Sequence, residues 1–250
     1  MTVRVVIPAR MASSRLPRKM LADIAGKPMI QHVYEQAIKS QATSVMIATD
    51  HEEIAQAAKD FSAPVCMTRE DHASGTSRIA EVVELQGYQD DDVIINLQGD
   101  EPLLPPELID QVAALLIATP AAAMATLSEP MKDVDDVLSP RDVKVVTDQH
   151  GFALYFSRAP IPFDVKRFSQ STPTLSDTFV YQRHIGLYAY RAAFLKNYIN
   201  LAPSPFESLE SLEQLRVLWH GEKIILANAV KHAGAAVDTP EDLEKVKKLF

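Results

Sequence analysis

Cysteine and long apolar runs are both scarce in this sequence. Among its 250 residues there is a single cysteine, Cys66, which excludes an internal disulfide and any cysteine-rich metal site. No apolar run approaches the roughly 18 residues that a membrane span requires. The N-terminus lacks the apolar segment of a secretion signal. We therefore expect a cytoplasmic protein that is not inserted in a membrane.

The common glycine-rich phosphate-binding motifs are also missing. Neither G-x-x-x-x-G-K nor G-x-G-x-x-G occurs, which argues against a dinucleotide-dependent dehydrogenase. The seven histidines and the cysteine show neither the spacing of a metal site nor a nucleophile–base pattern. Any bound phosphate must therefore be held mainly by Arg and Lys side chains, helped by backbone N–H groups.

Positive charge is concentrated near the N-terminus. The whole chain has a formal net charge of −8, but residues 1–28 hold six basic residues against one acidic residue. An apolar strand is predicted at 3–7, and a cation-rich loop follows it as far as Lys19. In a doubly wound sheet, such a loop is where an anionic nucleotide tail binds. A basic island in an acidic chain argues against a nucleic-acid or membrane surface; a solvated basic loop is the alternative.

Apolar runs typical of strands alternate with helical patterns through the first half of the chain. Strands are predicted at 3–7, 44–48, 64–67 and 92–97, with a helix after each. This alternation predicts an α/β, Rossmann-like fold: a mostly parallel central sheet with helices on both faces. The carboxyl ends of parallel strands share one edge, so the polar segments after these strands should meet in a crevice.

The pattern changes beyond about residue 121. Predicted strands at 143–146, 152–157 and 185–190, with no long helix between the first two, indicate a smaller antiparallel inserted layer. An amphipathic helix is predicted at 209–219. A strand follows at 224–230, and Asp238 or Thr239 then caps a last helix. We expect a single domain over residues 1–250.

Two carboxylates are candidates for binding a divalent cation. Asp100 follows the predicted strand at 92–97 and would face the cationic loop, and Asp238 follows the strand at 224–230. Mg²⁺ prefers one or two carboxylates together with substrate phosphates. The structural alternatives are a turn residue for Asp100 and a helix N-cap for Asp238. The spacing does not show whether the two are paired.

Other polar residues have both a functional and a structural interpretation. Ser74, Thr76 and Arg78 either contact a base or sugar, or cap and decorate a helix. Arg158 and His184 lie at strand edges, where a structural role is usual. A solvated helix face is the usual interpretation of three further residues: Glu210, Glu213 and Gln214. Residue-level reasoning thus ends at a nucleotide-using, magnesium-dependent α/β enzyme.

Ten collinear stretches, which together span nearly the whole chain, resemble the 3-deoxy-manno-octulosonate cytidylyltransferases, or CMP-Kdo synthetases. They include IPARMASSRLPRKML, VCMTREDHASGTSRIAEV, VIINLQGDEPLL, ALYFSRAPIPFD, LESLEQLRVLWHGEKI and VDTPEDLEKV. The resemblance implies a nucleotidyltransferase fold and a cytoplasmic homodimer. It also implies CTP and 3-deoxy-D-manno-octulosonate (Kdo) as substrates, with release of pyrophosphate and formation of CMP-Kdo for lipopolysaccharide biosynthesis.

The resemblance further implies roles for individual residues. The nucleotide-binding set is Pro8, Ala9, Arg10, Ser13, Arg15, Lys19, Ser74, Gly75, Thr76, Arg78, Gln98 and Asp100. The sugar-binding set is Gln98, Arg158, His184, Tyr188, Glu210 and Gln214. Asp100 and Asp238 would bind Mg²⁺, with Arg15 and Lys19 beside them in catalysis. Residues of about 1–120 and 222–250 would form the nucleotide-binding core, and about 121–221 the sugar-binding and dimerisation part.

One position departs from the family pattern. The family loop reads R-L-P-G-K, whereas Arg18 precedes Lys19 here. If the glycine has a positive φ, an arginine there costs about 1 kcal/mol and bears on the position of Lys19.

Two rival functions remain open on the sequence alone. The acceptor could be another ulosonic acid, such as sialic acid or an amino-Kdo, or a sugar phosphate. A non-catalytic nucleotide-binding or regulatory protein would be favoured if the cationic loop, Asp100 or Asp238 were missing, and all three are present.

Overall fold

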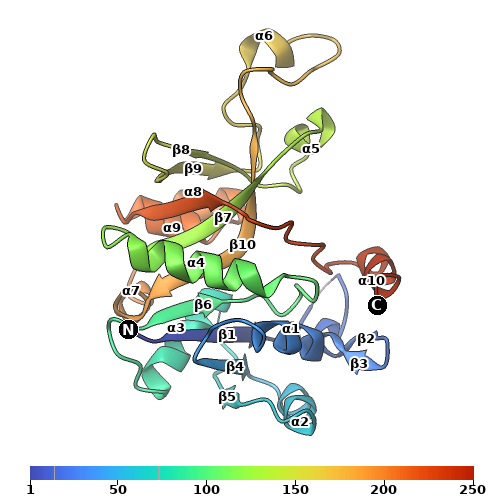
Figure 1. The fold of residues 1–250 in the computed structure, drawn as a ribbon, viewed down its shortest axis with the longest axis vertical. Coiled ribbons are helices and arrows are strands. Elements are labelled where there is room, and N and C mark those ends of the chain that lie inside the picture. Colours follow the sequence, from blue (N-terminus) through green and yellow to red (C-terminus); the bar gives the residue numbers. More distant parts are fainter. Residues whose placement is uncertain (14, 73) are drawn as a thin grey trace.

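A mixed sheet forms the centre of the molecule. The computed structural model describes residues 1–13, 15–72 and 74–250, so Ser14 of the cationic loop lies outside the described residues. The strand order along the main path is β11-β7-β10-β6-β1-β4-β5 (Figure 1). These strands are β1 (Val3–Ala9), β4 (Ser44–Thr49), β5 (Val65–Met67), β6 (Val93–Asn96), β7 (Met124–Pro130), β10 (Gln182–Arg191) and β11 (Ile224–Asn228).

Most neighbouring strands of this sheet run parallel. β1 is parallel to β4 and β6, β4 to β5, and β11 to β7, whereas β10 is antiparallel to both β6 and β7. Successive residues of β1 enter different apolar clusters: Val5 and Ile7 pack on one face of the sheet and Val6 on the other. Both faces are therefore buried, which confirms the predicted α/β class.

Helices cover both faces of the sheet. The larger ones are α1 (Met29–Ala37), α2 (Glu52–Asp60), α3 (Gly75–Leu85), α4 (Pro106–Ala118), α7 (Ala192–Tyr198) and α10 (Pro240–Lys247). The apolar sides of α1 and α4 join one cluster, and those of α3 and α7 join the other. Near the N-terminal loop lie a 3₁₀ turn, η1 (Lys19–Leu21), and a small hairpin of β2 (Asp23–Ile24) and β3 (Lys27–Pro28).

The predicted antiparallel layer is present and stands above the main sheet. β8 (Lys144–Thr147) pairs with β9 (Ala153–Ser157), and both pairings of β8, with β9 and with β10, are antiparallel. Residues 159–181, which contain α6 (Val165–Phe168), form an arm that projects from this layer, and α5 (Val134–Leu138) lies beside it (Figure 1).

The structure differs from the sequence analysis at two places. β7 was not predicted, although it lies inside the main sheet. The helix predicted at 209–219 is two short helices, α8 (Pro205–Glu210) and α9 (Gln214–Trp219), because Ser211 adopts a left-handed conformation with φ 53°.

Candidate active site

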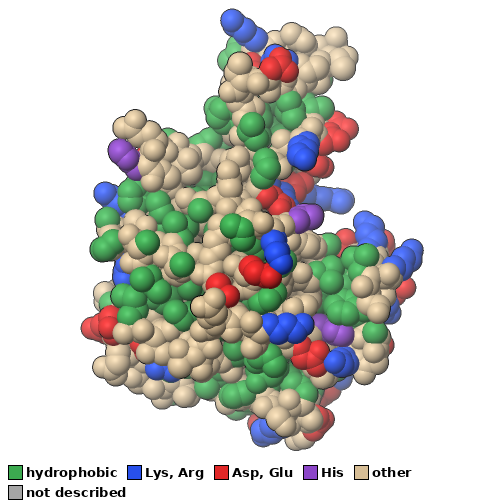
Figure 2. Space-filling view, in the orientation of Figure 1, with side chains coloured by type: hydrophobic (Ala, Val, Ile, Leu, Met, Phe, Trp, Pro, Cys, Tyr) green, Lys and Arg blue, Asp and Glu red, His purple; other side chains and the backbone are tan. Residues whose placement is uncertain are grey.

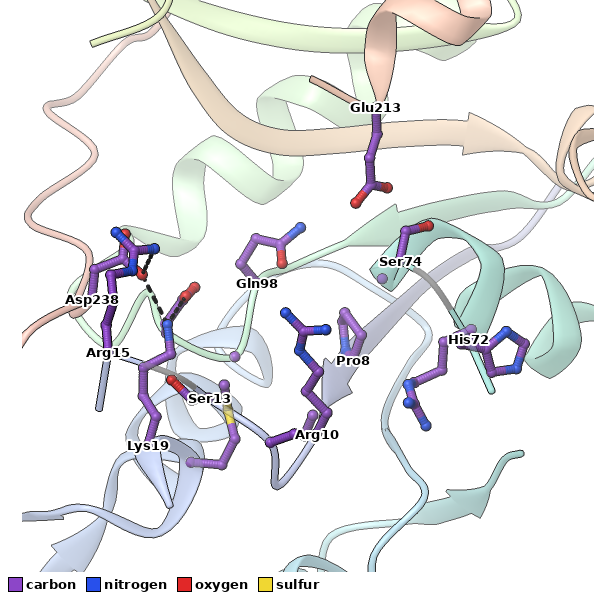
Figure 3. A pocket seen from close by; sticks show the side chains of 17 residues that line it. Pro8, Arg10, Ser13, Arg15, Lys19, His72, Ser74, Gln98, Glu213 and Asp238 are labelled. Carbon is purple, nitrogen blue, oxygen red and sulfur yellow. Dashed lines mark hydrogen bonds and ion pairs between the residues drawn. The ribbon is translucent and has the colours of Figure 1, made fainter. Parts of the chain in front are cut away.

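The polar segments after three parallel strands meet in one cavity, as predicted. β1 brings Pro8 and Ala9 to its wall, the segment after β5 leads to α3, and Gln98 to Asp100 follow β6. Figure 3 shows these side chains around the hollow, with Glu213 reaching into it from the opposite side. Predicted site residues that line the cavity are Pro8, Ala9, Arg10, Ser13, Arg15, Lys19, Ser74, Gly75, Arg78, Gln98, Asp100 and Asp238.

Lys19 is the centre of the charged cluster in this cavity. Its ammonium lies 2.5 Å from Asp100 Oδ2 and 3.0 Å from Asp238 Oδ1, and Arg15 Nη2 lies 2.9 Å from the same Asp238 oxygen. Burial alone lowers the pKa of Lys19, but the two carboxylates outweigh burial and raise the pKa above its usual value. The structure therefore brings four residues from three distant parts of the chain into one charged cluster, with the protonated Lys19 amine at its centre.

The pairing of Asp100 with Asp238, which spacing could not show, is now visible. Thr239 caps α10 through its hydroxyl, and its side chain and that of Asp242 form a capping box. Asp238 is therefore not the N-cap, and its carboxylate turns towards Lys19 and Arg15.

Two carboxylates that converge on one cation are a suitable donor set for Mg²⁺ when phosphate oxygens complete the coordination. The described ranges contain no group of three or more His, Cys, Asp and Glu residues that could hold a metal ion without help. The residues present therefore fit an ion that shares its coordination with the substrate.

Arg18 has the positive φ that the glycine of the family loop led us to expect, with φ 57° and ψ 30°. Its guanidinium pairs with Glu53 on α2. Lys19 nonetheless reaches both carboxylates, so the substitution leaves the charged cluster assembled.

The start of α3 forms the wall of the cavity opposite the charged cluster. Ser74 caps the helix by accepting a hydrogen bond from the Ser77 N–H, and Gly75 lies close to Pro8. Arg78 is 3 % exposed, and its guanidinium donates to Asp50 Oδ2 at 2.5 Å. These residues thus have structural partners and line the cavity at the same time.

Of two further residues near this cavity, Gly99 lines it and Thr76 does not. Thr76, predicted to bind nucleotide, is buried behind the wall and donates from its hydroxyl to Glu213 at 2.7 Å. Gly99 lies on the wall itself, where a Cβ would come within 2.7 Å of Met20 Sδ and 3.1 Å of the Pro8 carbonyl oxygen. A larger residue at position 99 would therefore require Met20 and the Pro8 carbonyl to shift.

Glu213 is a cavity residue that the sequence analysis missed. It was assigned to a solvated helix face, but its carboxylate accepts from Thr76 and faces the cationic loop across the hollow (Figure 3). The solvated-face interpretation is wrong because the break at Ser211 turns residues 212–214 inward. The signal that could have found Glu213 is its place beside Gln214 in the LESLEQLRVLW stretch.

A second cavity adjoins the first and shares Asp238 with it. Its lining includes His184 and Tyr188 from β10 and Gln214 from α9, three of the predicted sugar-binding residues. Gln214 is 3 % exposed, and its Nε2 has no hydrogen-bond partner among the described residues. A buried amide donor without a partner is unfavourable by about 1–3 kcal/mol, so this position suits a polar ligand.

Hydrogen bonding fixes the tautomer of His184 in that cavity. The Thr126 hydroxyl has one hydrogen, which goes to the carbonyl oxygen of Ile185 or Leu187, so His184 Nε2–H must donate to Thr126 Oγ1. Burial, followed by the nearby Arg183 charge, lowers the pKa of His184 to about 3. The ring is therefore neutral at pH 7, and its Nδ1 is a hydrogen-bond acceptor.

Arg158 and Glu210 are placed differently from the other predicted sugar-binding residues. They lie against each other between β9 and α8: the Arg158 backbone N–H donates to Glu210 Oε2 at 2.9 Å, and Arg158 Nε donates to the Glu210 carbonyl oxygen at 2.7 Å. Neither lines the two cavities described above.

This combination of fold and site is that of a nucleotidyltransferase, and the comparisons agree. Residues 4–224 match the family model described as cytidylyltransferase. The chain belongs to the cytidylyltransferase family. A solved cytidylyltransferase from Leptospira borgpetersenii, 17% identical with a TM-score of 0.62, shares the fold over 100% of this chain and 88% of its own.

More similar relatives narrow the family. A 3-deoxy-manno-octulosonate cytidylyltransferase of Pectobacterium carotovorum is 55% identical over 100% of this chain and 99% of its own length. One from Yersinia enterocolitica is 54% identical over 98% and 97%. The solved CMP:2-keto-3-deoxy-manno-octonic acid synthetase, complexed with CTP, is 42% identical with a TM-score of 0.90, and covers 100% of this chain and 98% of its own. These relatives confirm the resemblance drawn from the sequence.

Proposed function

We propose that this chain transfers CMP from CTP to Kdo, releasing pyrophosphate and forming CMP-Kdo. The observation that carries the proposal is the pair of adjoining cavities that share Asp238. One has a wall of cations, and the other holds the neutral His184 ring and the unpartnered amide of Gln214. A triphosphate suits the first cavity and a polyhydroxy acid the second, so the reacting atoms would meet beside Asp238. The names of the 55% and 54% identical relatives support the same pair of substrates.

In the proposed reaction, the anomeric hydroxyl of Kdo attacks the α-phosphorus of CTP. A new P–O bond forms as the bond to pyrophosphate breaks in line, and the hydroxyl proton passes to solvent. Arg10, which has no carboxylate partner among the described residues, and Arg15 would bind the departing phosphates. Lys19 supplies a fixed positive charge at the same place. Catalysis is then mainly positioning and charge stabilisation.

Asp100 and Asp238 would hold Mg²⁺, which supplies positive charge to the α-phosphate oxygens and makes the attacking hydroxyl more acidic. Lys19 holds both carboxylates in place before substrate binds. No side chain is assigned as general base. The neutral His184 ring and the Tyr188 hydroxyl would instead orient the sugar acid.

We further propose a homodimer that acts in the cytoplasm, in the synthesis of lipopolysaccharide. The described residues contain no helix long and apolar enough to cross a bilayer. The projecting arm exposes apolar side chains that a second copy of the chain would cover (Figure 2). These are Phe163, Val165, Phe179 and Val180.

The test is pyrophosphate release by the purified protein with CTP and Mg²⁺, with and without Kdo, alongside sialic acid, an amino-Kdo, a sugar phosphate and other nucleotides. We expect release only when CTP and Kdo are both present. Release with a different acid would keep the mechanism and change the acceptor. A folded protein that binds CTP and releases no pyrophosphate with any acceptor would contradict catalysis and favour a regulatory nucleotide-binding protein.

A further inference from the structure

A buried lysine fixes the end of β9 near the two cavities. Lys144 is 0% exposed, and its ammonium donates to the carbonyl oxygens of Ser139, Asp142 and Arg158 at 2.7, 2.6 and 2.6 Å. An ammonium has three donors, so three carbonyls satisfy it fully. Removing it would take the ammonium partner from three partly buried carbonyl oxygens, among them the Arg158 carbonyl directly after β9.

The Glu210 carboxylate accepts hydrogen bonds from the same segment at the end of β9. Ser157 Oγ donates to Glu210 Oε1 at 2.6 Å, and the Arg158 N–H donates to Oε2 at 2.9 Å. Arg158 also donates from Nη1 to the Pro140 carbonyl oxygen at 2.9 Å. Both carboxylate oxygens of Glu210 are thus occupied by the protein itself. We refer to Lys144, Ser157, Arg158 and Glu210 as the Glu210 cluster.

The Glu210 cluster lies directly before the turn that carries two cavity residues. Glu210 ends α8, Ser211 turns the chain with φ 53°, and Glu213 and Gln214 then enter the first and second cavities. A left-handed conformation is unfavourable for a non-glycine residue, so contacts on both sides must hold it. The Glu210 cluster is on one side, and the Thr76–Glu213 hydrogen bond is on the other.

We propose that the Glu210 cluster is a positioning device for the acceptor site: it holds the Ser211 turn, and so sets the places of Glu213 and Gln214, without touching the acceptor. This rests on the proposed function only in taking Kdo as the acceptor. It assigns Glu210 and Arg158 a different role from the direct sugar contacts that the family resemblance implies. A direct ligand would line a cavity, and these two residues bind each other outside both.

The test compares Glu210→Gln and Ser157→Ala with Asp177→Asn, which breaks an exposed ion pair to Arg167 within the projecting arm. Glu210→Gln keeps the side-chain size but replaces one acceptor by an NH₂ group. We expect both cluster variants to raise KM for Kdo about tenfold and to change the Kd for CTP less than twofold. Asp177→Asn should match the unsubstituted protein.

A double-mutant cycle with Gln214→Ala separates positioning from direct contact. Because the cluster acts through the turn, Glu210→Gln should change KM for Kdo less than threefold once Gln214 is replaced. Equal effects in the two backgrounds would contradict the proposal, as would an unchanged KM in both cluster variants.

Failure of the proposed function is recognised separately, because the unsubstituted protein would then release no pyrophosphate with CTP and Kdo. The positioning role is in that case tested without substrate, by amide hydrogen exchange. We expect residues 211–215 to exchange at least tenfold faster in Glu210→Gln and Ser157→Ala than in Asp177→Asn. Equal exchange in all three would overturn the proposal.

Discussion

At the scale of single residues, the contacts of Lys19 explain why basic residues are concentrated in the N-terminal loop: this loop faces Asp100 and Asp238. One amine holds two carboxylates that are 138 positions apart in the chain, and Arg15 adds a second cation to Asp238. The sequence predicted each of these residues, because each follows a strand that ends at the same edge of the sheet. Their mutual distances depend on the fold as a whole and could not be predicted.

Asp100→Asn tests this cluster most simply. The amide cannot replace a carboxylate beside the reacting phosphate, so we expect turnover to fall roughly 100-fold, as on loss of a group that stabilises transition-state charge. Steady-state pyrophosphate release measures the effect. Asp60→Asn, an exposed change on α2 away from the cavity, is the control and should leave turnover unaltered. Near-normal turnover in Asp100→Asn would remove Asp100 from the mechanism.

Arg18 offers a test of backbone strain. At φ 57°, glycine avoids the steric conflict that alanine and arginine share. Arg18→Gly and Arg18→Ala both lose the ion pair with Glu53, so their difference reports the backbone alone. We expect the glycine variant to unfold with a free energy about 1 kcal/mol higher than the alanine variant in urea denaturation. Equal stabilities would show that the left-handed conformation costs this loop nothing.

At the scale of elements, β10 carries two predicted sugar-binding residues, His184 and Tyr188, but the sequence could not predict how the strand directs their side chains. Its pairing with β7 shifts register between Ile185 and Tyr188. The Thr126 hydroxyl on β7 lies at this irregularity, 3.0 Å from the Ile185 carbonyl oxygen and 2.9 Å from the Leu187 carbonyl oxygen. Bulges of this kind redirect side chains, here towards the second cavity. β7 was missed because its buried face includes Thr126 and Ser128, whose polarity hides the strand.

His184 on β10 makes a prediction about pH. Its pKa is lowered to about 3 in the folded protein and is about 6.5 in an unfolded chain, so below pH 6.5 only the unfolded state gains the proton. Stability is therefore lost as the pH falls from about 6.5 towards 3. Between pH 7 and 4.5, the unsubstituted protein should lose roughly 2–3 kcal/mol more unfolding free energy than His184→Gln.

Denaturant unfolding of the two proteins at both pH values measures this difference. The two proteins share their carboxylates, so the contribution of these groups to the pH dependence of the unfolding free energy cancels in the comparison. Parallel pH dependences would show that His184 takes up a proton in the folded protein as readily as in the unfolded one.

The α8–α9 region gives the second reason why sequence patterns failed. Leu209 and Trp219 suggested one continuous apolar face, but Leu209 is 83% exposed and the helix breaks at Ser211. Helical periodicity cannot reveal a left-handed serine, because serine is compatible with a helix. Glu213 enters the cavity because of this break, so its role could not be predicted without knowing the left-handed conformation of Ser211.

At the scale of the whole molecule, the parallel core was predictable and the inserted layer only in outline. β1, β4, β5 and β6 are short β-branched runs followed by polar loops, a pattern with few other interpretations. The arm at 159–181 has little apolar periodicity. Tyr181 at its end packs with Met131 and Val137 outside the arm, and several apolar side chains of the arm remain exposed.

The exposed arm leads to a prediction about assembly. If a second copy covers it, light scattering at micromolar concentration should give about twice the chain mass of 27.6 kDa. Val165→Glu, which places a charge on the most exposed of these apolar side chains, should shift the mass towards the monomer without unfolding the protein. A monomeric mass for the unsubstituted protein would contradict the dimer.

The central claim is that the two cavities bring an acceptor hydroxyl to the α-phosphorus of CTP beside Asp238. The most direct measurement follows each phosphorus atom, using CTP labelled at the α or the γ position together with Kdo. We expect α-label in the sugar nucleotide and γ-label in pyrophosphate, in equal amounts. Gamma-label released as inorganic phosphate, or α-label that stays with free nucleotide, would contradict it.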